Sequence, residues 1–271
     1  MPGVILAVLD HPAAAKALLT AARHLAELFA ATRINVLIVR APPETMVSPS
    51  EEVLTEEREA HLRAVEADRV GAVRTEFDAW SADVPTTLRI EWIDIDGIAE
   101  LIVEERGRRA DYIVVEHPSR QDYGINWHAL RAALFATDRP VLLVPHDHNA
   151  GFGRRIAVAW RDDERATKAV LTALRTVERP DQAFVLAGTR AGTAPPELPS
   201  IFAEHGVAAE LHVLPISGGQ FGEALLRKAH ELGADMLVMG AYQHTPLREL
   251  LLGGVTRYML SHADMPLLMR H

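Results

Sequence analysis

Two stretches of the chain decide the fold, VILAVLDHPAAAKALLTAARHLAELFA at residues 4–30 and RIAVAWRDDERATKAVLTALRTVE at residues 155–178. Each stretch is a short apolar run, a polar break, and then apolar residues at steps of three and four. A short continuous apolar run is typical of a buried strand, and the three- and four-residue spacing is typical of a helix with one buried face. Each stretch therefore predicts a strand followed by a helix, once near the N-terminus and once near the middle of the chain.

The ends of the two halves match as well. RRADYIVVEHP (108–118) parallels LGADMLVMGAY (232–242), and RAALFATDRPVLLVP (131–145) parallels RYMLSHADMPLLMRH (257–271). Over the first ten positions of the second pair the identical residues are Arg131 and Arg257, Leu134 and Leu260, Asp138 and Asp264, and Pro140 and Pro266. Matches at the same relative places in both halves predict an internal duplication.

Each half predicts five strands that alternate with helices. The expected strands are 4–9, 34–40, 87–93, 111–116 and 140–145 in the first half, and 155–160, 182–187, 209–214, 235–240 and 265–270 in the second. Runs such as YIVVE and MLVMG are apolar throughout, which is typical of parallel strands buried on both faces. The predicted fold is α/β, with two tandem doubly wound, Rossmann-like domains, each a five-stranded parallel sheet with helices on both faces. The polar segment HDHNAGFG (146–153) separates domain 1 (1–147) from domain 2 (153–271).

The two halves differ in their middle parts. The first half has a long charged segment, 42–84, whose apolar residues are expected to form one helix face: Leu62, Val65, Val70, Val73, Phe77 and Trp80. The second half has only GTRAGTAPPELPSIFAEHG (188–206), whose prolines and glycines predict a loop with a short helix.

Composition narrows the class of protein. The 271 residues carry a net charge of −9 and no cysteine, so disulfides and thiolate metal sites are excluded, and broad binding to nucleic acid is not expected. No apolar run approaches the length of a membrane span, and the N-terminus lacks the pattern of a signal peptide. We expect a soluble cytoplasmic protein.

The stretch GAYQHTPLRELLLGG (240–254) predicts a site for an anion. Gly240 ends a strand at the edge where open α/β sheets bind ligands, and Gly253 and Gly254 begin the last helix. Free amides and the helix dipole at a helix start favour an anion, and glycine permits close approach of a phosphate.

With two α/β units and this late glycine stretch, the chain resembles a tandem universal stress protein over essentially its whole length. Nucleotide-binding members of that family carry Gly, two residues, Gly, nine residues, Gly, and then Ser or Thr. The spacing is intact here, but Gln243 replaces a glycine and Gly254 replaces the hydroxyl residue. The resemblance implies binding of ATP or a related adenine nucleotide in domain 2, with Mg²⁺ only if the nucleotide binds.

The resemblance also implies the residues of that site. The end of the first strand of domain 2 would hold adenine, but Arg161 stands where the family has an Asp and cannot accept a base hydrogen bond. Arg161 is suited instead to pairing with a phosphate or stacking on a base. The expected binding residues are Ala159, Trp160, Arg161, Met239, Gly240, Tyr242, Gln243, Gly253, Gly254, Val255 and Thr256.

The equivalent site in domain 1 is expected to be degenerate. Glu116 stands at the place of Gly240, and the stretch after it has no glycine pair. A carboxylate there repels a polyphosphate. Asp10 matches the family's base-binding Asp, but its expected role is local, at a helix start with Asp10 near the N-cap and Pro12 near the first helical position.

Other readings stay open at this stage. Asp162, Asp163 and Glu164 would suit a Mg²⁺ ion beside a phosphate, or would favour a helix start. His146 and His148 offer imidazoles to a metal but fit a solvated linker better, and no catalytic group is predicted. The resemblance implies a stress-response protein that acts by binding, with slow Mg²⁺-dependent ATP hydrolysis as a weak alternative. The last strands of the two halves would pair as an internal pseudo-dimer, with a homodimer of chains beyond it. The alternative function is a stress or scaffold protein that binds no nucleotide and meets protein partners through segment 42–84.

Overall fold

The computed structural model describes residues 3–47, 54–118, 125–177, 180–216, 220–241 and 254–271. The chain divides into two compact units. Unit 1 comprises Met1–Glu116 with Gln121–Arg139, and unit 2 comprises His117–Arg120 with Pro140–His271. The strand that ends the first sequence repeat thus groups with unit 2. The predicted division into domains 1–147 and 153–271 stays a prediction.

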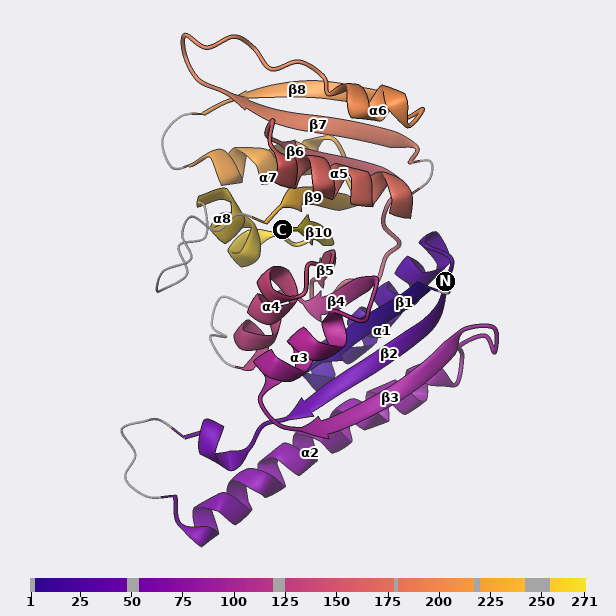
Figure 1. Ribbon diagram of the computed structural model, residues 1–271, viewed down its shortest axis with the longest axis vertical. Helices are drawn as coiled ribbons and strands as arrows, with labels where there is room; N and C mark the ends of the chain where they lie inside the picture. The colour runs from indigo at the N-terminus through magenta and orange to yellow at the C-terminus, as the bar shows by residue number, and fades with distance from the viewer. Residues whose placement is uncertain (1–2, 48–53, 119–124, 178–179, 217–219, 242–253) are drawn as a thin grey trace. The chain divides into compact units, whose positions relative to one another are not determined.

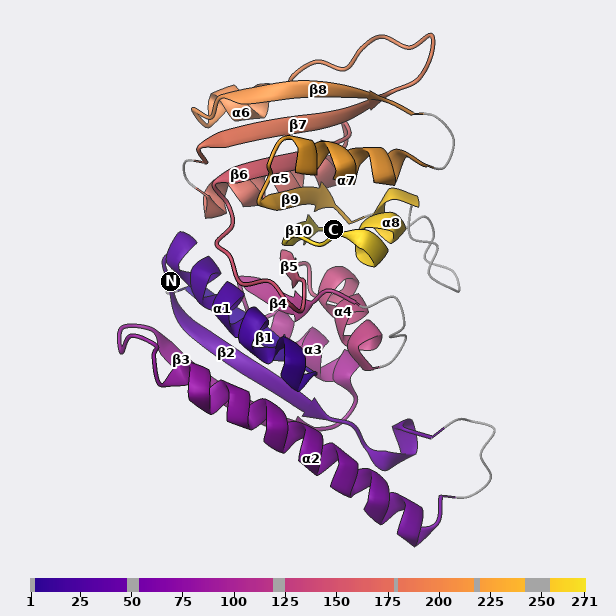
Figure 2. The ribbon, with the colours of Figure 1, turned by 180° about the vertical axis from the view of Figure 1, so that it is seen from behind.

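Unit 1 is a parallel sheet in the strand order β3-β2-β1-β4. Two helices, α1 and α2, cover one face, and α3 and α4 cover the other, as the opposite views in Figures 1 and 2 show. The elements are β1 (Gly3–Leu9), α1 (Pro12–Leu28), β2 (Ala31–Arg40), η1 (Pro43–Thr45), α2 (Glu56–Ser81), β3 (Arg89–Asp96), α3 (Ala99–Gly107), β4 (Tyr112–Glu116) and α4 (Ile125–Ala136).

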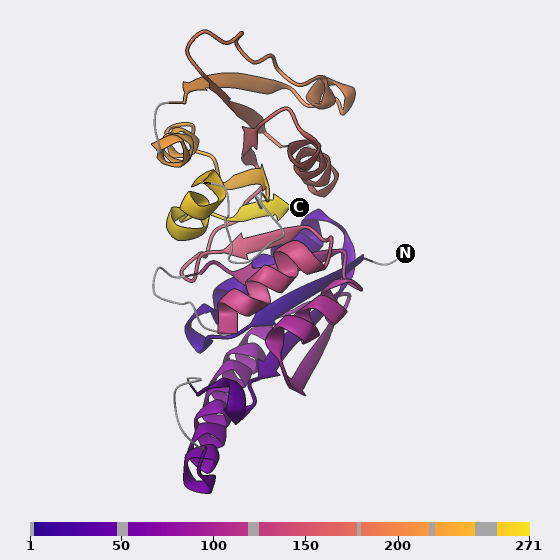
Figure 3. The same ribbon diagram turned by 60° about the vertical axis from the view of Figure 1, so that its left-hand side comes forward.

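Unit 2 has the strand order β5-β10-β9-β6-β7-β8, parallel except that β5 is antiparallel to β10, with Leu142 opposite Leu268. Helix α5 covers one face, and α7 and α8 cover the other (Figure 3). The elements are β5 (Val141–Val144), β6 (Arg155–Trp160), α5 (Glu164–Thr176), β7 (Gln182–Thr189), α6 (Ser200–Glu204), β8 (Ala209–Pro215), α7 (Phe221–Glu231), β9 (Met236–Gly240), α8 (Gly254–His262) and β10 (Leu267–Arg270). An internal pseudo-dimer and a homodimer remain predictions.

The α/β fold class is confirmed, and each predicted strand is present with its ends shifted by a few residues. The central strands β4 and β9 are buried almost throughout, which explains why they are apolar at every position rather than at every second one. None of the helices within the described parts of the chain has both the length and the apolarity to cross a membrane.

Corresponding aspartates hold corresponding strands in the two units. Asp111 accepts a hydrogen bond from the backbone N–H of Val4, and Asp235 accepts from those of Gly153 and Arg155. In each case the carboxylate just before the fourth strand of the repeat accepts hydrogen bonds from the backbone at the start of the first strand. The matched sequences therefore perform the same structural task.

Helix α2 departs from the predicted pattern at one position. Val70, Val73 and Phe77 are buried as expected, but Val65 is 46% exposed, so its placement on the apolar face was wrong. The buried position on that turn belongs to Glu66, which is 5% exposed. A one-residue shift moves a side chain by about 100° around a helix, and the polar contacts of Glu66 determine which residue faces inward.

Candidate functional site

The candidate site lies in unit 2, where the ends of β6 and β9 meet the start of α8. A pocket of about 200 Å³ opens there. It is lined by seven of the predicted residues, namely Ala159, Trp160, Arg161, Met239, Gly254, Val255 and Thr256, and by Leu186, Phe221 and Leu225. Gly240 is buried at the end of β9, beside Arg270, and is not among the lining residues. Tyr242, Gln243 and Gly253 lie outside the described residues.

Thr256 is the most informative residue of this pocket. It lies in the first turn of α8, is 0% exposed, and its hydroxyl has no hydrogen-bond partner among the described residues. Leaving a buried hydroxyl unpaired costs about 1–3 kcal/mol, so such groups are rare and call for a partner. A ligand oxygen in the pocket would supply one. The predicted phosphate motif has a hydroxyl residue next to this turn, and the structure offers a hydroxyl at Thr256.

The charge of the pocket comes from Arg161, directly after β6. Its guanidinium pairs with Asp163, which is also the N-cap of α5 and accepts a hydrogen bond of 3.0 Å from the Ala166 amide. Glu164 pairs with Lys168 on the outside of α5. Asp163 and Glu164 therefore contact different partners, and their contacts are those expected at the start of a helix.

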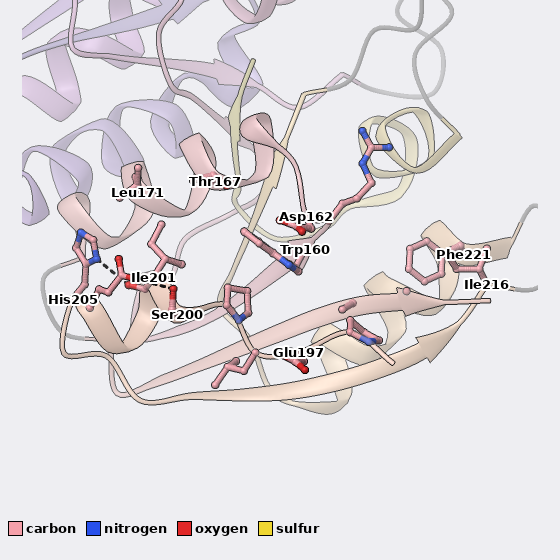
Figure 4. Close-up of a pocket in the computed structure, with 17 residues that line it drawn as sticks. Trp160, Asp162, Thr167, Leu171, Glu197, Ser200, Ile201, His205, Ile216 and Phe221 are labelled. Atoms are coloured by element: carbon pink, nitrogen blue, oxygen red, sulfur yellow. Dashed lines mark hydrogen bonds between the residues drawn. The ribbon is translucent and has the colours of Figure 1, made fainter. Parts of the chain in front are cut away.

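A second, larger pocket of about 940 Å³ adjoins the first and shares Trp160, Arg161 and Phe221 with it. Thr167 and Leu171 of α5 line one side of it, as labelled in Figure 4. That connection supplies the opposite wall, with Pro196, Glu197, Leu198, Pro199, Ser200, Ile201, Glu204 and His205. The predicted loop with a short helix is present, but its contribution to a pocket was not foreseen.

The equivalent strand ends in unit 1 are occupied by the chain itself. The guanidinium of Arg69, from α2, donates five hydrogen bonds, to the Asp10 carbonyl and carboxylate, to the Val39 carbonyl, and to both carboxylate oxygens of Glu66. Glu66 in turn accepts a hydrogen bond of 2.8 Å from the Ala41 amide. Sequence reasoning missed this network, whose one signal was the Glu66–Arg69 spacing of three residues on a helix.

The predicted helix start is present, with Asp10 next to the N-cap, but the Asp10 side chain does not cap it. The N-cap of α1 is His11, without a side-chain capping bond, although Pro12 does occupy the first helical position. The Asp10 carboxylate instead faces Arg69 at 2.9 Å, and Glu116 accepts from His11 Nδ1–H at 3.0 Å. The Asp10 carboxylate pairs with Arg69 rather than with the start of α1, because Arg69 is a charged hydrogen-bond donor whereas the amides at a helix N-terminus are neutral.

Burial and hydrogen bonding shift the pKa values of this network in opposite directions. Burial raises the pKa of Asp10 more than the positive charges of Arg69 and His11 lower it. Burial also acts to raise the pKa of Glu66, but the hydrogen bonds from Arg69 and the Ala41 amide outweigh it, so that this pKa is lowered. Glu66 is thus held as a carboxylate beside Arg69.

Two histidines near the ends of strands make contacts within the protein. His117 Nε2 lies 3.0 Å from the carbonyl oxygen of Met259 and donates to it, and His128 is exposed 3.7 Å from Glu100. His244 lies outside the described residues. No group of three metal-ligating side chains occurs within the described ranges.

Comparisons with known proteins agree with this architecture. Residues 162–271 match the model of the Universal stress protein family. A universal stress protein from Archaeoglobus fulgidus DSM 4304 superposes with a TM-score of 0.66 at 13% identity, covering 98% of this chain and 97% of that one. The functionally unknown protein PA1789 from Pseudomonas aeruginosa PAO1 gives 0.57 at 15% identity, covering 98% and 92%. No curated protein sequence matches.

Proposed function

We propose that the protein is a cytoplasmic stress protein that binds an adenine nucleotide in unit 2, from the premise that residues 162–271 match the model of the Universal stress protein family. The observation that carries the proposal is the buried hydroxyl of Thr256, which has no hydrogen-bond partner among the described residues and lies in a pocket at the strand ends. Ligands of open α/β sheets bind at this edge. The hydroxyl and the start of α8 favour an anionic oxygen there.

The two adjoining pockets suit the two ends of a nucleotide. The phosphates would lie at Gly254 and Thr256, where free amides of the first helical turn and the nearby Arg161 favour negative charge. The base would pass Trp160 into the larger pocket, where Ala187 and Gly188 form part of the floor. A Cβ atom added at Gly254 would meet no heavy atom within 4 Å among the described residues, so the space above this residue is open to a ligand.

We propose that the protein acts by binding rather than by turnover, because the described residues around Thr256 place no general base beside the expected phosphates. Mg²⁺ would enter only with the nucleotide, on its phosphate oxygens. Sustained release of phosphate from ATP by the purified protein would refute this part of the proposal and favour the hydrolase alternative.

Isothermal titration with ATP, ADP and AMP, with and without Mg²⁺, tests the proposal. The variant Thr256→Val keeps the shape of the side chain and removes the hydroxyl. It should lower affinity for ATP about tenfold or more, because a hydrogen bond to a charged group contributes about 1.5–3 kcal/mol. Gly254→Leu should abolish binding by filling the open space at the helix start.

A matched control is Thr137→Val in unit 1. Thr137 is equally buried, but its hydroxyl donates to the Ala133 carbonyl at 2.6 Å and accepts from the Arg139 amide. Thr137→Val should destabilise the protein and leave ATP affinity unchanged, whereas Thr256→Val should leave stability unchanged or raised. The absence of binding heat at high micromolar ATP, or equal affinity of wild type and Thr256→Val, would refute nucleotide binding through this hydroxyl.

A further inference from the structure

A row of three side chains forms the floor of the small pocket in unit 2. Ala159 of β6 lies between Leu186 of β7 and Met239 of β9, because the strand register pairs it with both. All three line the pocket of about 200 Å³. Leu186 and Met239 are 0% and 2% exposed, whereas Ala159 is partly exposed. The small side chain in the middle of the row therefore leaves a depression between two larger ones.

The equivalent place in unit 1 is filled by larger side chains. By strand register Val8 of β1 corresponds to Ala159, and it is only 8% exposed. The matched sequences RAALFATDRP and RYMLSHADMP place Leu130, which is 1% exposed, where unit 2 has Thr256. Both of the smaller residues of unit 2 line the same pocket. The depression therefore arises from two smaller side chains within the same arrangement of strands.

Two helices that cover this face of the sheet form the walls (Figure 3). Helix α7 contributes Phe221 and Leu225, one turn apart, and α8 contributes Val255 and Thr256. The Phe221 ring packs closely against Gly188, where an added Cβ would come within 2.6 Å of the Phe221 Cζ atom. Close packing therefore fixes the position of this wall. We define the β6 hollow as the space bounded by Ala159, Leu186, Leu225, Met239, Val255 and Thr256.

The β6 hollow is apolar apart from one hydroxyl. Thr256 is 0% exposed, and its hydroxyl has no hydrogen-bond partner among the described residues. It lies in the first turn of the nine-residue helix α8, and the start of a helix favours an anion. Arg161 is the only cationic residue among the described lining residues, and Asp163 already pairs with it. The hollow therefore offers one place for an anionic oxygen, next to surfaces that favour hydrocarbon.

Volume and charge limit the group that fits the hollow. A pocket of about 200 Å³ is smaller than the roughly 300–1,000 Å³ of sites that hold whole drug-sized ligands, so it holds one end of a ligand. With the first phosphate at Thr256 and the base past Trp160, the side chains of Leu186, Leu225 and Met239 face whatever is attached to that phosphate. The further phosphates of ATP would bring charge against these apolar side chains, which is costly. A hydrocarbon group in the same place is stabilised by burial.

We propose that the nucleotide bound by unit 2 carries a short apolar group on its 5′-phosphate, as in a short-chain acyl adenylate, and that this group occupies the β6 hollow. The inference rests on the proposed function, since it assigns the phosphate to Thr256. One phosphate oxygen accepts a hydrogen bond from the Thr256 hydroxyl, while the apolar group lies on Ala159 between Leu186 and Met239. The ligand class is a nucleoside monophosphate with a small hydrocarbon end.

Isothermal titration of the full-length protein with methyl, ethyl and propyl esters of the AMP 5′-phosphate tests the inference, because these esters carry the same charge and differ only in hydrocarbon. Affinity should rise about fourfold for each methylene that enters the hollow, and hence about tenfold or more from the methyl to the propyl ester. Propyl phosphate, which lacks the nucleoside, should bind at least tenfold more weakly than the propyl ester. Thr256→Val should weaken all three esters alike, because it removes a contact to the phosphate.

Filling the hollow gives a second readout. Ala159→Val gives unit 2 the side chain that Val8 provides in unit 1, and it should abolish the advantage of the propyl ester while the methyl ester binds as before. Val8→Ala is the matched control, because it removes the same two methyl groups from unit 1 and should leave the affinities of all three esters unchanged. The esters compared on the wild type keep the test decisive should Ala159→Val fail to fold.

The outcomes separate this inference from the proposed function. Equal affinity of the wild type for the methyl and propyl esters, with ATP or AMP still bound, would overturn the inference alone. Unchanged preference for the propyl ester in folded Ala159→Val protein would overturn it as well. Failure of every adenine compound to bind would refute the proposed function and the inference together, and propyl phosphate that bound as tightly as the propyl ester would show that the nucleoside is not part of the ligand.

Discussion

The buried carboxylate of Glu66 provides a sharp test of how unit 1 is held together. Its two oxygens accept hydrogen bonds from Arg69 at 2.7 and 2.8 Å and from the Ala41 amide at 2.8 Å. In Glu66→Gln the amide group brings two N–H donors to a place where both neighbours are also donors. At least one charge-assisted bond is lost, and the Arg69 charge is left with Asp10 alone.

We expect Glu66→Gln to lower the free energy of unfolding of unit 1 by about 2–3 kcal/mol. A hydrogen bond to a charged group contributes about 1.5–3 kcal/mol, and complete removal of one partner of a buried ion pair costs about 3–5 kcal/mol. Glutamine retains one acceptor, so the loss falls below the upper limit. Hydrogen exchange of the α2 peptides, measured by mass spectrometry, reports on this unit specifically.

The effect should depend on pH with a defined sign. The pKa of Glu66 is lower in the folded protein than its ordinary value of 4.5, because the hydrogen bonds from Arg69 and Ala41 outweigh burial. Its stabilisation is therefore complete above the unfolded pKa and disappears as the pH falls through the folded pKa. The difference between wild type and Glu66→Gln should be largest near neutral pH and narrow below about pH 4.

The matched control is Glu59→Gln on the same helix. Glu59 pairs with the exposed Arg63 one turn away, an interaction typically worth less than about 1 kcal/mol. The reasoning about Glu66 fails if both variants destabilise unit 1 equally, or if the difference between Glu66→Gln and wild type persists unchanged in acid.

Three further predictions follow from local contacts. Asp163→Ala removes the N-cap bond to the Ala166 amide and should lower the stability of unit 2 by about 1 kcal/mol in a urea titration. Gly222→Ala should lower the melting temperature, because the new Cβ would come within 2.6 Å of the Tyr258 Cβ, and overpacking of this kind costs about 1–3 kcal/mol. Deletion of residues 56–81 should unfold unit 1, visible as lost near-ultraviolet circular dichroism, since α2 buries apolar side chains there.

The strands were predictable because burial on both faces leaves a strong signal in the sequence. Strands such as YIVVE and MLVMG are buried at every position except the partly buried Glu116, and short apolar runs of this kind are typical of strands covered on both faces. The seven lining residues of the small pocket were predictable for a related reason. Sheet topology brings the ends of parallel strands and the helix after them to one edge, whatever the details of the loops.

The Arg69 network was not predictable from the pattern of apolar residues. Glu66 and Arg69 stand in a helix rich in charge, where glutamate and arginine are normally solvated. The spacing of Val65 continues the apolar face, but Glu66 is the buried residue. Its position is explained by its hydrogen bond from the Ala41 amide and by the hydrogen bonds that Arg69 donates to Asp10 and Val39. Tertiary hydrogen bonds determined the rotation of this helix, and they join residues up to 59 positions apart.

The two repeats differ in the connection between their second and third strands rather than in the strands themselves. Both units have the same order of their first strands and nearly the same helix after the first strand, and Leu19 and Leu171 stand at equivalent places. The backbone acceptors at the strand ends must be satisfied in either case, because burying them unpaired is costly. Unit 1 satisfies its acceptors permanently, through a long helix that delivers a guanidinium. In unit 2 the Arg161 carbonyl, the counterpart of the Asp10 carbonyl, accepts from the Asp163 amide at 2.7 Å, and the shorter connection leaves a pocket beside it. The same argument predicts that lengthening the connection in unit 2 until a helix covers Leu171 would close the pocket and raise the stability of the unit, which a urea titration would measure.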